Sequence, residues 1–145
     1  GVQSIKLKAE LRTDNPPATP ILKEWGVSWI PAGERRIKAT VTIRNADSRS
    51  ISARFRAVVF YAESLSDSVG DPAEDYAKWD AEADAVDVIE FGSVTLNPGE
   101  TISASASNIP LNIWAEGTKI DAGVALLDAD QNFYDSLKVS DVVEV

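Results

Sequence analysis

The chain is 145 residues long, and its composition of 44% hydrophobic and 26% charged residues is that of one globular domain. It contains no Cys, His or Met, which excludes a disulfide framework, a thiolate nucleophile and any imidazole base or ligand. The formal net charge is −9, but residues 1–60 carry a net +6 and residues 61–145 a net −15. This asymmetry indicates electrostatic complementarity within the molecule or between copies. No run is long and apolar enough to predict membrane insertion.

Alternation of apolar and polar residues with a period of two predicts β-strands along most of the chain. In chain order, the alternating or β-rich runs are 5–11, 25–29, 37–43, 51–59, 86–96, 102–106, 120–126 and 133–145. Turn-forming residues separate several of them, at 45–48, 97–100 and 128–132. About eight short strands with such turns are typical of an all-β antiparallel sandwich or barrel.

One segment departs from this pattern and predicts a helix. Asp71 is a favourable N-cap residue, and Pro72 suits the first helical position. Tyr76 and Trp79 then fall on one face at helical spacing. We expect one short helix near residues 72–84, inside a long connection between strands. Connections of this length usually cover something, and we expect Tyr76 and Trp79 to plug an open end of the sandwich.

Three turn features mark residues 35–145. A strand ends in Asn45-Ala46-Asp47, the turn Leu96-Asn97-Pro98-Gly99-Glu100 opens a later strand, and the last hairpin has a short polar tip. This pattern resembles the immunoglobulin-like, CARDB-type sandwich modules of bacterial, archaeal and phage surface or appendage proteins. The resemblance implies an antiparallel immunoglobulin-like β-sandwich of about seven to eight strands. It also implies non-catalytic work, such as adhesion, display, spacing or assembly on a cell surface, filament or virion.

The N-terminal part has a second pattern. An alternating strand reaches Thr13-Asp14, followed by Thr19-Pro20-Ile21-Leu22 and an aromatic-rich strand from Trp25 to Trp29. This pattern resembles the closing strand pair of another type of surface module. We therefore expect residues 1–30 to be a strand arm or the tail of a neighbouring module, and residues 31–145 to form the β-sandwich. A chain that begins at Gly1 and has no Met is expected to be a processed, tagged or excised piece.

Acidic side chains concentrate between Glu63 and Glu90, where ten Asp and Glu residues occur. Paired carboxylates can hydrolyse glycosides or bind Ca²⁺. However, nothing in the spacing selects a pair with a raised pKa. We therefore expect a solvated acidic face, no catalytic residues and no cofactor, and hence a protein that is not an enzyme.

The last predicted turn offers weak calcium candidates. Asp128, Asp130 and Asn132 match the start of a calcium-binding loop. Its sixth position is Phe133 and its twelfth is Val139, where an EF-hand needs Gly and Glu. A polar hairpin tip is the favoured interpretation.

Aromatic rings are the candidates for a carbohydrate-binding site. Trp25 and Trp29 share one strand face, which is more often core than a sugar platform. Trp114 lies in a predicted loop, and with Tyr76 and Trp79 it would bind ligand if the chain were a carbohydrate-binding module, with or without Ca²⁺.

Basic residues alternate with apolar ones on two consecutive predicted strands, which we expect to form a hairpin with one cationic face. The predicted partner-binding residues are Arg36, Lys38, Arg44, Arg54 and Arg56. Nucleic acid is disfavoured because the domain is acidic and because no aromatic residue lies among the basic residues on that strand face until Phe60. The expected partner is acid from residues 62–90, folded over the face or supplied by a neighbouring copy. An N-terminal strand that completes a neighbour's sheet edge would add affinity.

These observations predict a non-catalytic structural, adhesion or assembly module, located extracellularly, at a cell surface or in a virion. It would act through self-association or contacts with neighbouring modules. A carbohydrate-binding module is the alternative.

Overall fold

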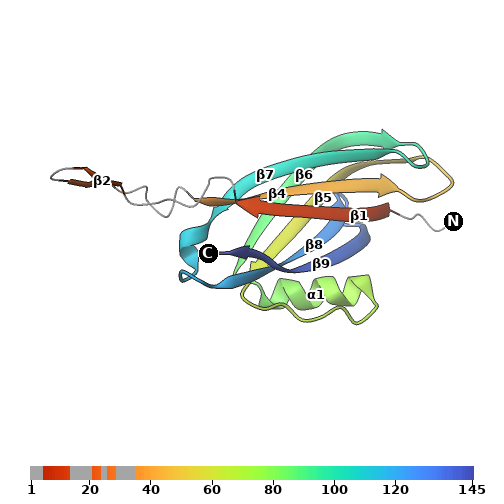
Figure 1. Ribbon diagram of the computed structural model, residues 1–145. Coiled ribbons are helices and arrows are strands. Elements are labelled where there is room, and N and C mark those ends of the chain that lie inside the picture. Colours follow the sequence, from red (N-terminus) through yellow and green to blue (C-terminus); the bar gives the residue numbers. More distant parts are fainter. Residues whose placement is uncertain (1–4, 14–20, 24–25, 29–34) are drawn as a thin grey trace.

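The computed structural model describes residues 5–13, 21–23, 26–28 and 35–145, and shows two antiparallel sheets packed face to face (Figure 1). The elements are β1 (Ile5–Thr13), β2 (Ile21–Lys23), β3 (Gly26–Ser28), β4 (Arg36–Asn45), β5 (Ile51–Ala62), α1 (Pro72–Glu82), β6 (Ala85–Leu96), β7 (Thr101–Pro110), the 3₁₀ turn η2 (Leu111–Ile113), β8 (Lys119–Asp128) and β9 (Phe133–Glu144). One sheet has the order β1-β4-β7 and the other β6-β5-β8-β9, while β2 and β3 pair with each other. The predicted all-β sandwich with one short helix is confirmed.

Alternating side chains from both sheets fill the space between them. In β4, the inward residues Ile37, Ala39, Val41 and Ile43 are all 0% exposed. In β5 and β8, the inward residues are Phe55, Ala57, Val59, Tyr61, Ile120, Ala122, Val124 and Leu126. Burial of the Val, Leu, Ile and Phe side chains among them contributes roughly 1.5–3 kcal/mol each and is the main force that holds the two sheets together.

The N-terminal strand β1 joins the first sheet. It pairs antiparallel with β4 over its whole length, from Ile5 opposite Asn45 to Thr13 opposite Ile37. Leu7 of β1 is buried in the core between the sheets. Part of the segment expected to be an arm or a tail therefore packs on residues 35–145. Trp25 and Trp29, predicted to share a strand face, lie outside the described residues.

The prediction that β4 and β5 form a hairpin is wrong. β4 pairs with β1 and β7, whereas β5 pairs with β6 and β8 in the other sheet. The turn after Asn45 carries the chain from one sheet to the other, because each strand must bury its apolar face against the same core. The basic side chains of β4 and β5 consequently point out from opposite faces of the sandwich, and no single face holds all five.

A buried asparagine determines this crossing. Asn45 is 0% exposed, and its side-chain amide donates to the carbonyls of Arg49 and Leu96, each at 2.8 Å. Its side-chain oxygen accepts from the Asp47 amide, and its backbone carbonyl accepts from the Gly99 amide. The turn between β4 and β5 and the turn between β6 and β7 are thus joined at one end of the sandwich. Gly99 has φ +81°, which favours glycine there.

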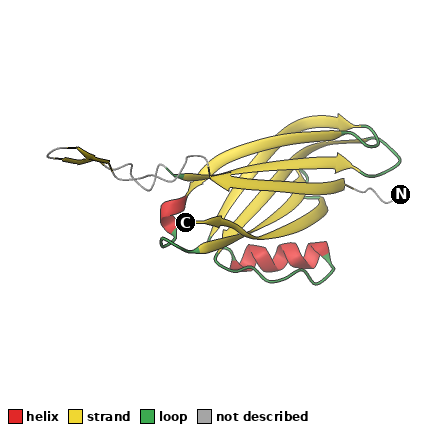
Figure 2. Cartoon of the chain, in the orientation of Figure 1, coloured by secondary structure: helices red, strands yellow, loops and turns green. Residues whose placement is uncertain are grey.

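The helix begins where the sequence predicts. The Asp71 side chain accepts hydrogen bonds from the amides of Ala73 and Glu74, and Pro72 is the first helical residue. Its position differs from the expectation, because α1 does not plug an end of the sandwich. It lies against β5, β8 and β9, on the outer face of their sheet (Figure 2).

Trp79 anchors α1 in a second hydrophobic core outside the sheet. Its ring is 1% exposed, and its Nε1 donates to the Ser66 carbonyl at 2.9 Å. The buried residues around it are Phe60, Ala62, Leu65, Ala125 and Leu127. Gly123 lies beneath the indole, where a Cβ atom would come within 2.7 Å of a ring carbon. The parts of β5 and β8 that lie under α1 are therefore buried on both faces, and this part of the molecule has three layers: sheet, sheet and helix.

Within the part of the chain that the structure describes, no helix has the length and apolar character needed to cross a membrane.

Candidate interaction surfaces

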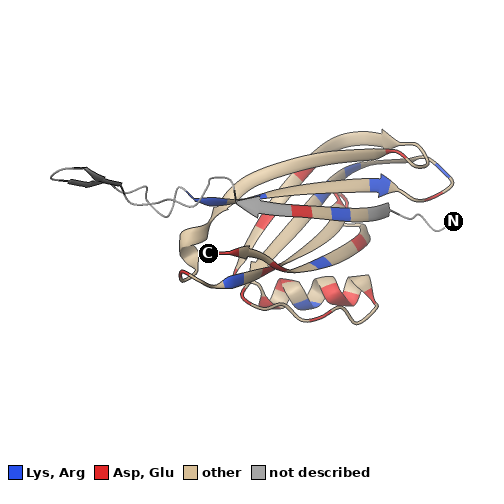
Figure 3. Cartoon of the chain, in the orientation of Figure 1, with Lys and Arg blue, Asp and Glu red and all other residues tan. Residues whose placement is uncertain are grey.

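The outer face of the β1-β4-β7 sheet carries basic and hydroxyl side chains. We call it the cationic face and define it by Lys8, Arg36, Lys38, Thr40, Thr42, Arg44, Ser103 and Ser105. Figure 3 shows its basic residues toward both ends of β4. Lys8, Lys38 and Arg44 are exposed. Among the described side chains of this face, the acidic residue is Glu10. The charge of this face is therefore positive although the chain is acidic.

Hydroxyl pairs cover the middle of the cationic face. Thr40 and Ser105 lie opposite each other on β4 and β7, with their hydroxyl oxygens 2.8 Å apart. Thr42 and Ser103 form the next pair at 2.6 Å. Because these side chains are short, the middle of the face carries little side-chain bulk. A hydroxyl can donate once and accept twice, so each pair keeps capacity for further hydrogen bonds.

The two basic residues of β5 lie on the other sheet. Arg56 is opposite Glu90 of β6, and its guanidinium is 3.3 Å from the Glu90 carboxylate. Arg54 is exposed beside Ser93. Of the predicted partner-binding residues, Arg56 is therefore engaged within the chain by acid from residues 62–90. The β4 residues are not covered in this way, because the acidic connection packs on the opposite side of the sandwich.

Acidic side chains gather on α1 and the segments that flank it. We call this surface the acidic face and define it by the exposed residues Glu63, Asp67, Asp71, Glu74, Asp80, Glu82 and Asp84. Lys78 lies among them, with its ammonium 3.5 Å from the Glu74 carboxylate. The predicted solvated acidic surface thus lies on the helical layer.

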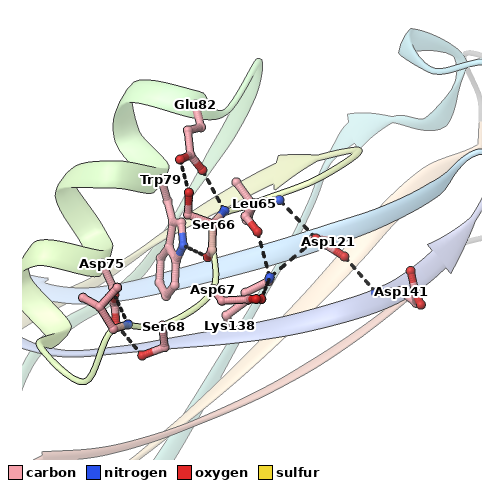
Figure 4. Close-up of polar contacts among 11 residues, drawn as sticks. Leu65, Ser66, Asp67, Ser68, Asp75, Trp79, Glu82, Asp121, Lys138 and Asp141 are labelled. Atoms are coloured by element: carbon pink, nitrogen blue, oxygen red, sulfur yellow. Dashed lines mark hydrogen bonds and ion pairs between the residues drawn. The ribbon is translucent and has the colours of Figure 1, made fainter.

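A buried lysine fastens the acidic connection to the sheet (Figure 4). The Lys138 ammonium on β9 donates to the Leu65 carbonyl at 2.7 Å and to Asp67 at 2.8 Å, and lies 3.8 Å from Asp121. The Asp121 carboxylate also accepts from the amides of Leu65 and Asp141. The Lys138 and Asp121 side chains are only 11% and 10% exposed. These contacts hold the chain after β5 close to β8 and β9.

Two more carboxylates hold the same connection against α1. Asp75, 2% exposed, accepts from the Ser68 hydroxyl and the Val69 amide, and these hydrogen bonds lower its pKa. Glu82 accepts from both the hydroxyl and the amide of Ser66, which lower its pKa. These acids therefore stabilise the connection in their ionised form.

The calcium candidates form the tip of the β8–β9 hairpin, as the favoured interpretation predicts. Asp128 accepts from the amides of Asp130 and Asn132, from the Asn132 side chain and from the Tyr134 hydroxyl. Burial acts to raise the pKa of Asp128, but the hydrogen bonds from Asn132, Tyr134 and Asp130 outweigh it and lower the pKa. Both carboxylate oxygens are thus used to shape the turn. Among the described residues, no three acids come together in a way that could hold a metal ion.

The aromatic candidates do not present open rings. Trp114, expected in an accessible loop, is 8% exposed and packs in the core between the sheets, because η2 turns it inward. Trp79 is buried beneath α1. Tyr76 is half-buried and stacks on Phe133, with ring centroids 5.8 Å apart. The expectation of sugar-stacking rings is therefore wrong for Trp79 and Trp114.

The sequence reasoning missed a buried polar group inside the sandwich. Asp87 is 6% exposed and accepts from the Asn108 side chain at 2.8 Å, while its second oxygen has no hydrogen-bond partner among the described residues. The Tyr61 hydroxyl is also buried and has no hydrogen-bond partner in the part of the chain that the structure describes. Its burial, and to a lesser extent the charge of Asp87, raises the pKa of Tyr61. The alternation pattern could have predicted the burial of Asp87, because Asp87 lies two residues before the buried Ile89 and so on the same face of the strand.

Comparison with known proteins identifies no family. No family model and no curated protein matches the chain. Among solved structures, a β-glucosidase from Erythrobacter marinus is similar over 95% of this chain and 15% of its own length, with 12% sequence identity and a TM-score of 0.41. A likeness this distant carries no argument about the fold or the function of this chain.

Proposed function

We propose that this chain is a non-catalytic structural, adhesion or assembly module that acts through protein–protein contacts. The observation that carries the proposal is the cationic face, a sheet surface whose Lys38 and Arg44 side chains reach solvent on an otherwise acidic chain. Charges arranged in this way select and orient a partner more than they supply affinity. Such a module belongs at a cell surface, on an extracellular filament or in a virion, as the resemblance of its turn motifs implies.

The engagement of the carboxylates supports a structural role for the acids. Asp75, Asp121 and Asp128 are each at least nine-tenths buried and accept hydrogen bonds that fix a connection or a turn. A general acid or base must instead meet a substrate proton, and its pKa usually lies nearer to neutral pH. The pKa values of Asp75 and Asp128 are lowered, which is the direction of a structural carboxylate.

Photo-crosslinking tests the proposed contact surface. Benzoylphenylalanine would replace Thr42 on the cationic face and, as the matched control, the exposed Lys119 at the start of β8. Irradiation of cells or particles that carry the protein is expected to give a protein adduct from position 42 and none from position 119. A glycan array and chromogenic glycoside, ester and peptide substrates complete the test. Specific glycan binding lost in Tyr76→Ala would point to a carbohydrate-binding module, and turnover of any substrate would establish an enzyme.

A further inference from the structure

We propose that the cationic face docks on the acidic face of a second copy of this chain, so that copies stack in one direction. The inference rests on the proposed function, since it names the partner of the same surface. Its basis is the placement of opposite charges on the two outer layers of one molecule. The cationic face is the outside of the β1-β4-β7 sheet, and the acidic face lies on α1 and its flanking segments.

The layering determines the symmetry of such a contact. The core between the sheets separates β4 from β5 and β8, and the second core separates those strands from α1. The two faces are therefore on opposite sides of the molecule. A contact between unlike faces is heterologous, and it leaves each end of a pair with one unused face. Because the faces point in opposite directions, addition of further copies extends a line and does not close a small ring.

The charges on the two faces are complementary. Lys8, Lys38 and Arg44 are exposed on one layer, and seven exposed acids define the other. Two basic residues near the acidic face are already held by its own acids, Lys78 by Glu74 and Lys138 by Asp67. The acidic face therefore keeps an excess of negative charge. Every copy of the chain carries both faces, so each cationic face has an acidic face available on another copy.

The dimensions of the cationic face predict weak association. β4 has 10 residues, so the face is about 33 Å long, and three strands make it about 14 Å wide. The resulting area of roughly 450 Å² is about half of what each partner buries in a standard stable interface. Exposed ion pairs contribute about 0–1 kcal/mol each and are screened by salt. Stacking should accordingly be concentration-dependent and strongest at low ionic strength.

Sedimentation velocity of the whole chain is the primary test. At about 0.01 M salt, where the Debye length is about 30 Å, the average mass should rise with protein concentration. At about 1 M salt, where it is about 3 Å, the chain should sediment as a monomer. Lys38→Glu should weaken association about tenfold, because it replaces an attraction by a repulsion. Lys119→Glu, with the same charge change on another exposed position, should weaken it less than about twofold.

A mixing experiment tests the direction of the contact. Lys38→Glu/Arg44→Glu disables the cationic face and Asp80→Lys/Asp84→Lys the acidic face, at exposed positions outside the helix cap and the Lys138 contacts. Each double variant alone should be monomeric. An equal mixture should give a one-to-one dimer that does not grow, because one intact face of each kind is present. Circular dichroism of each variant verifies that it is folded.

Three results would overturn the inference: a wild-type monomer at low salt, equal weakening by Lys38→Glu and Lys119→Glu, or a mixture that stays monomeric. Salt-sensitive binding of a monomeric wild-type chain to heparin, lost in Lys38→Glu, would assign the face to a polyanion and also overturn it. None of these four outcomes decides the broader proposal. A monomeric chain that still crosslinks to another protein from position 42 would retain that proposal and reject stacking.

Discussion

α1 covers part of the outer face of β5, β8 and β9, whereas the outer face of β1-β4-β7 exposes Lys38, Arg44 and two hydroxyl pairs. Both sheets bury the same kind of residue toward the common core. The difference lies in the outward residues: Phe60 and Leu127 of β5 and β8 are buried under α1, while Val86 and Val88 of the edge strand β6 stay exposed. The polar outward row of β1-β4-β7 is left available for contact. The covered face should therefore determine stability, and the cationic face association.

Removal of the Trp79 ring should have the largest effect. Trp79→Ala leaves a cavity between α1 and the sheet and exposes Phe60 and Leu127 to water. We expect a loss of about 4 kcal/mol in the free energy of unfolding, measured by urea denaturation. The exposed Val88→Ala on the same sheet is the control and should cost less than about 1 kcal/mol. Equal losses in the two variants would show that α1 contributes little to the fold.

Separation of Lys138 from its acids should have the next largest effect. Lys138→Met keeps most of the side-chain volume but leaves Asp121 as a poorly compensated charge that is 10% exposed. Such a loss typically costs about 3 kcal/mol. Hydrogen exchange of the Leu65 amide, which donates to Asp121, should report the loosened connection. A variant with unchanged stability and unchanged Leu65 exchange would contradict the fastening role. Lys119→Met is the exposed control.

A methyl group at Gly123 should test the contact of the helix with the sheet. Gly123→Ala places a carbon 2.7 Å from the Trp79 ring, so α1 must shift. We expect about 2 kcal/mol of destabilisation from this overpacking. In a Trp79→Ala background the same substitution should cost little, because the obstructing ring is gone. Additive losses in the double-mutant cycle would mean that Gly123 acts through backbone freedom and not through the indole.

Acid should loosen the covered face. Hydrogen bonds lower the pKa of Asp75 and Glu82 below their ordinary values of 3.8 and 4.5. Their bonds therefore contribute stability above those values, and the contribution is lost as the pH falls toward the folded pKa values. Asp135 acts in the opposite direction, because burial raises its pKa. Urea denaturation between about pH 5 and about pH 2.5 should show falling stability, with a flatter dependence in Asp75→Asn.

The fold class, the helix start and the polar hairpin tip could be predicted because each depends on local chemistry. Alternation defines strands, Asp71 and Pro72 define a helix start, and Asp128 organises its own turn. Strand partners depend on residues that are far apart in the sequence. The sequence pattern therefore predicts that the consecutive strands β4 and β5 pair, although they lie in different sheets. The cover over the outer face of β8 could have been predicted, because residues 120–127 are apolar on both strand faces apart from Asp121. The contacts of Lys138 with Leu65 and Asp67 had no such signal, because these residues are 73 and 71 positions away in the sequence.

The cationic face should tolerate substitution with the smallest effect on stability. Thr42→Ala removes one hydroxyl from an exposed pair with Ser103 and leaves both buried cores intact. The free energy of unfolding should change by less than about 0.5 kcal/mol, as is usual for surface positions. Lys38→Glu should be equally mild in urea denaturation while it weakens self-association, since its side chain reaches solvent. If either substitution instead destabilised the chain as much as Gly123→Ala, the hydroxyl and basic rows would be part of the folded framework. If the fold is preserved and association is altered, the two outer faces have different roles. The face covered by α1 then determines stability, and the cationic face determines association.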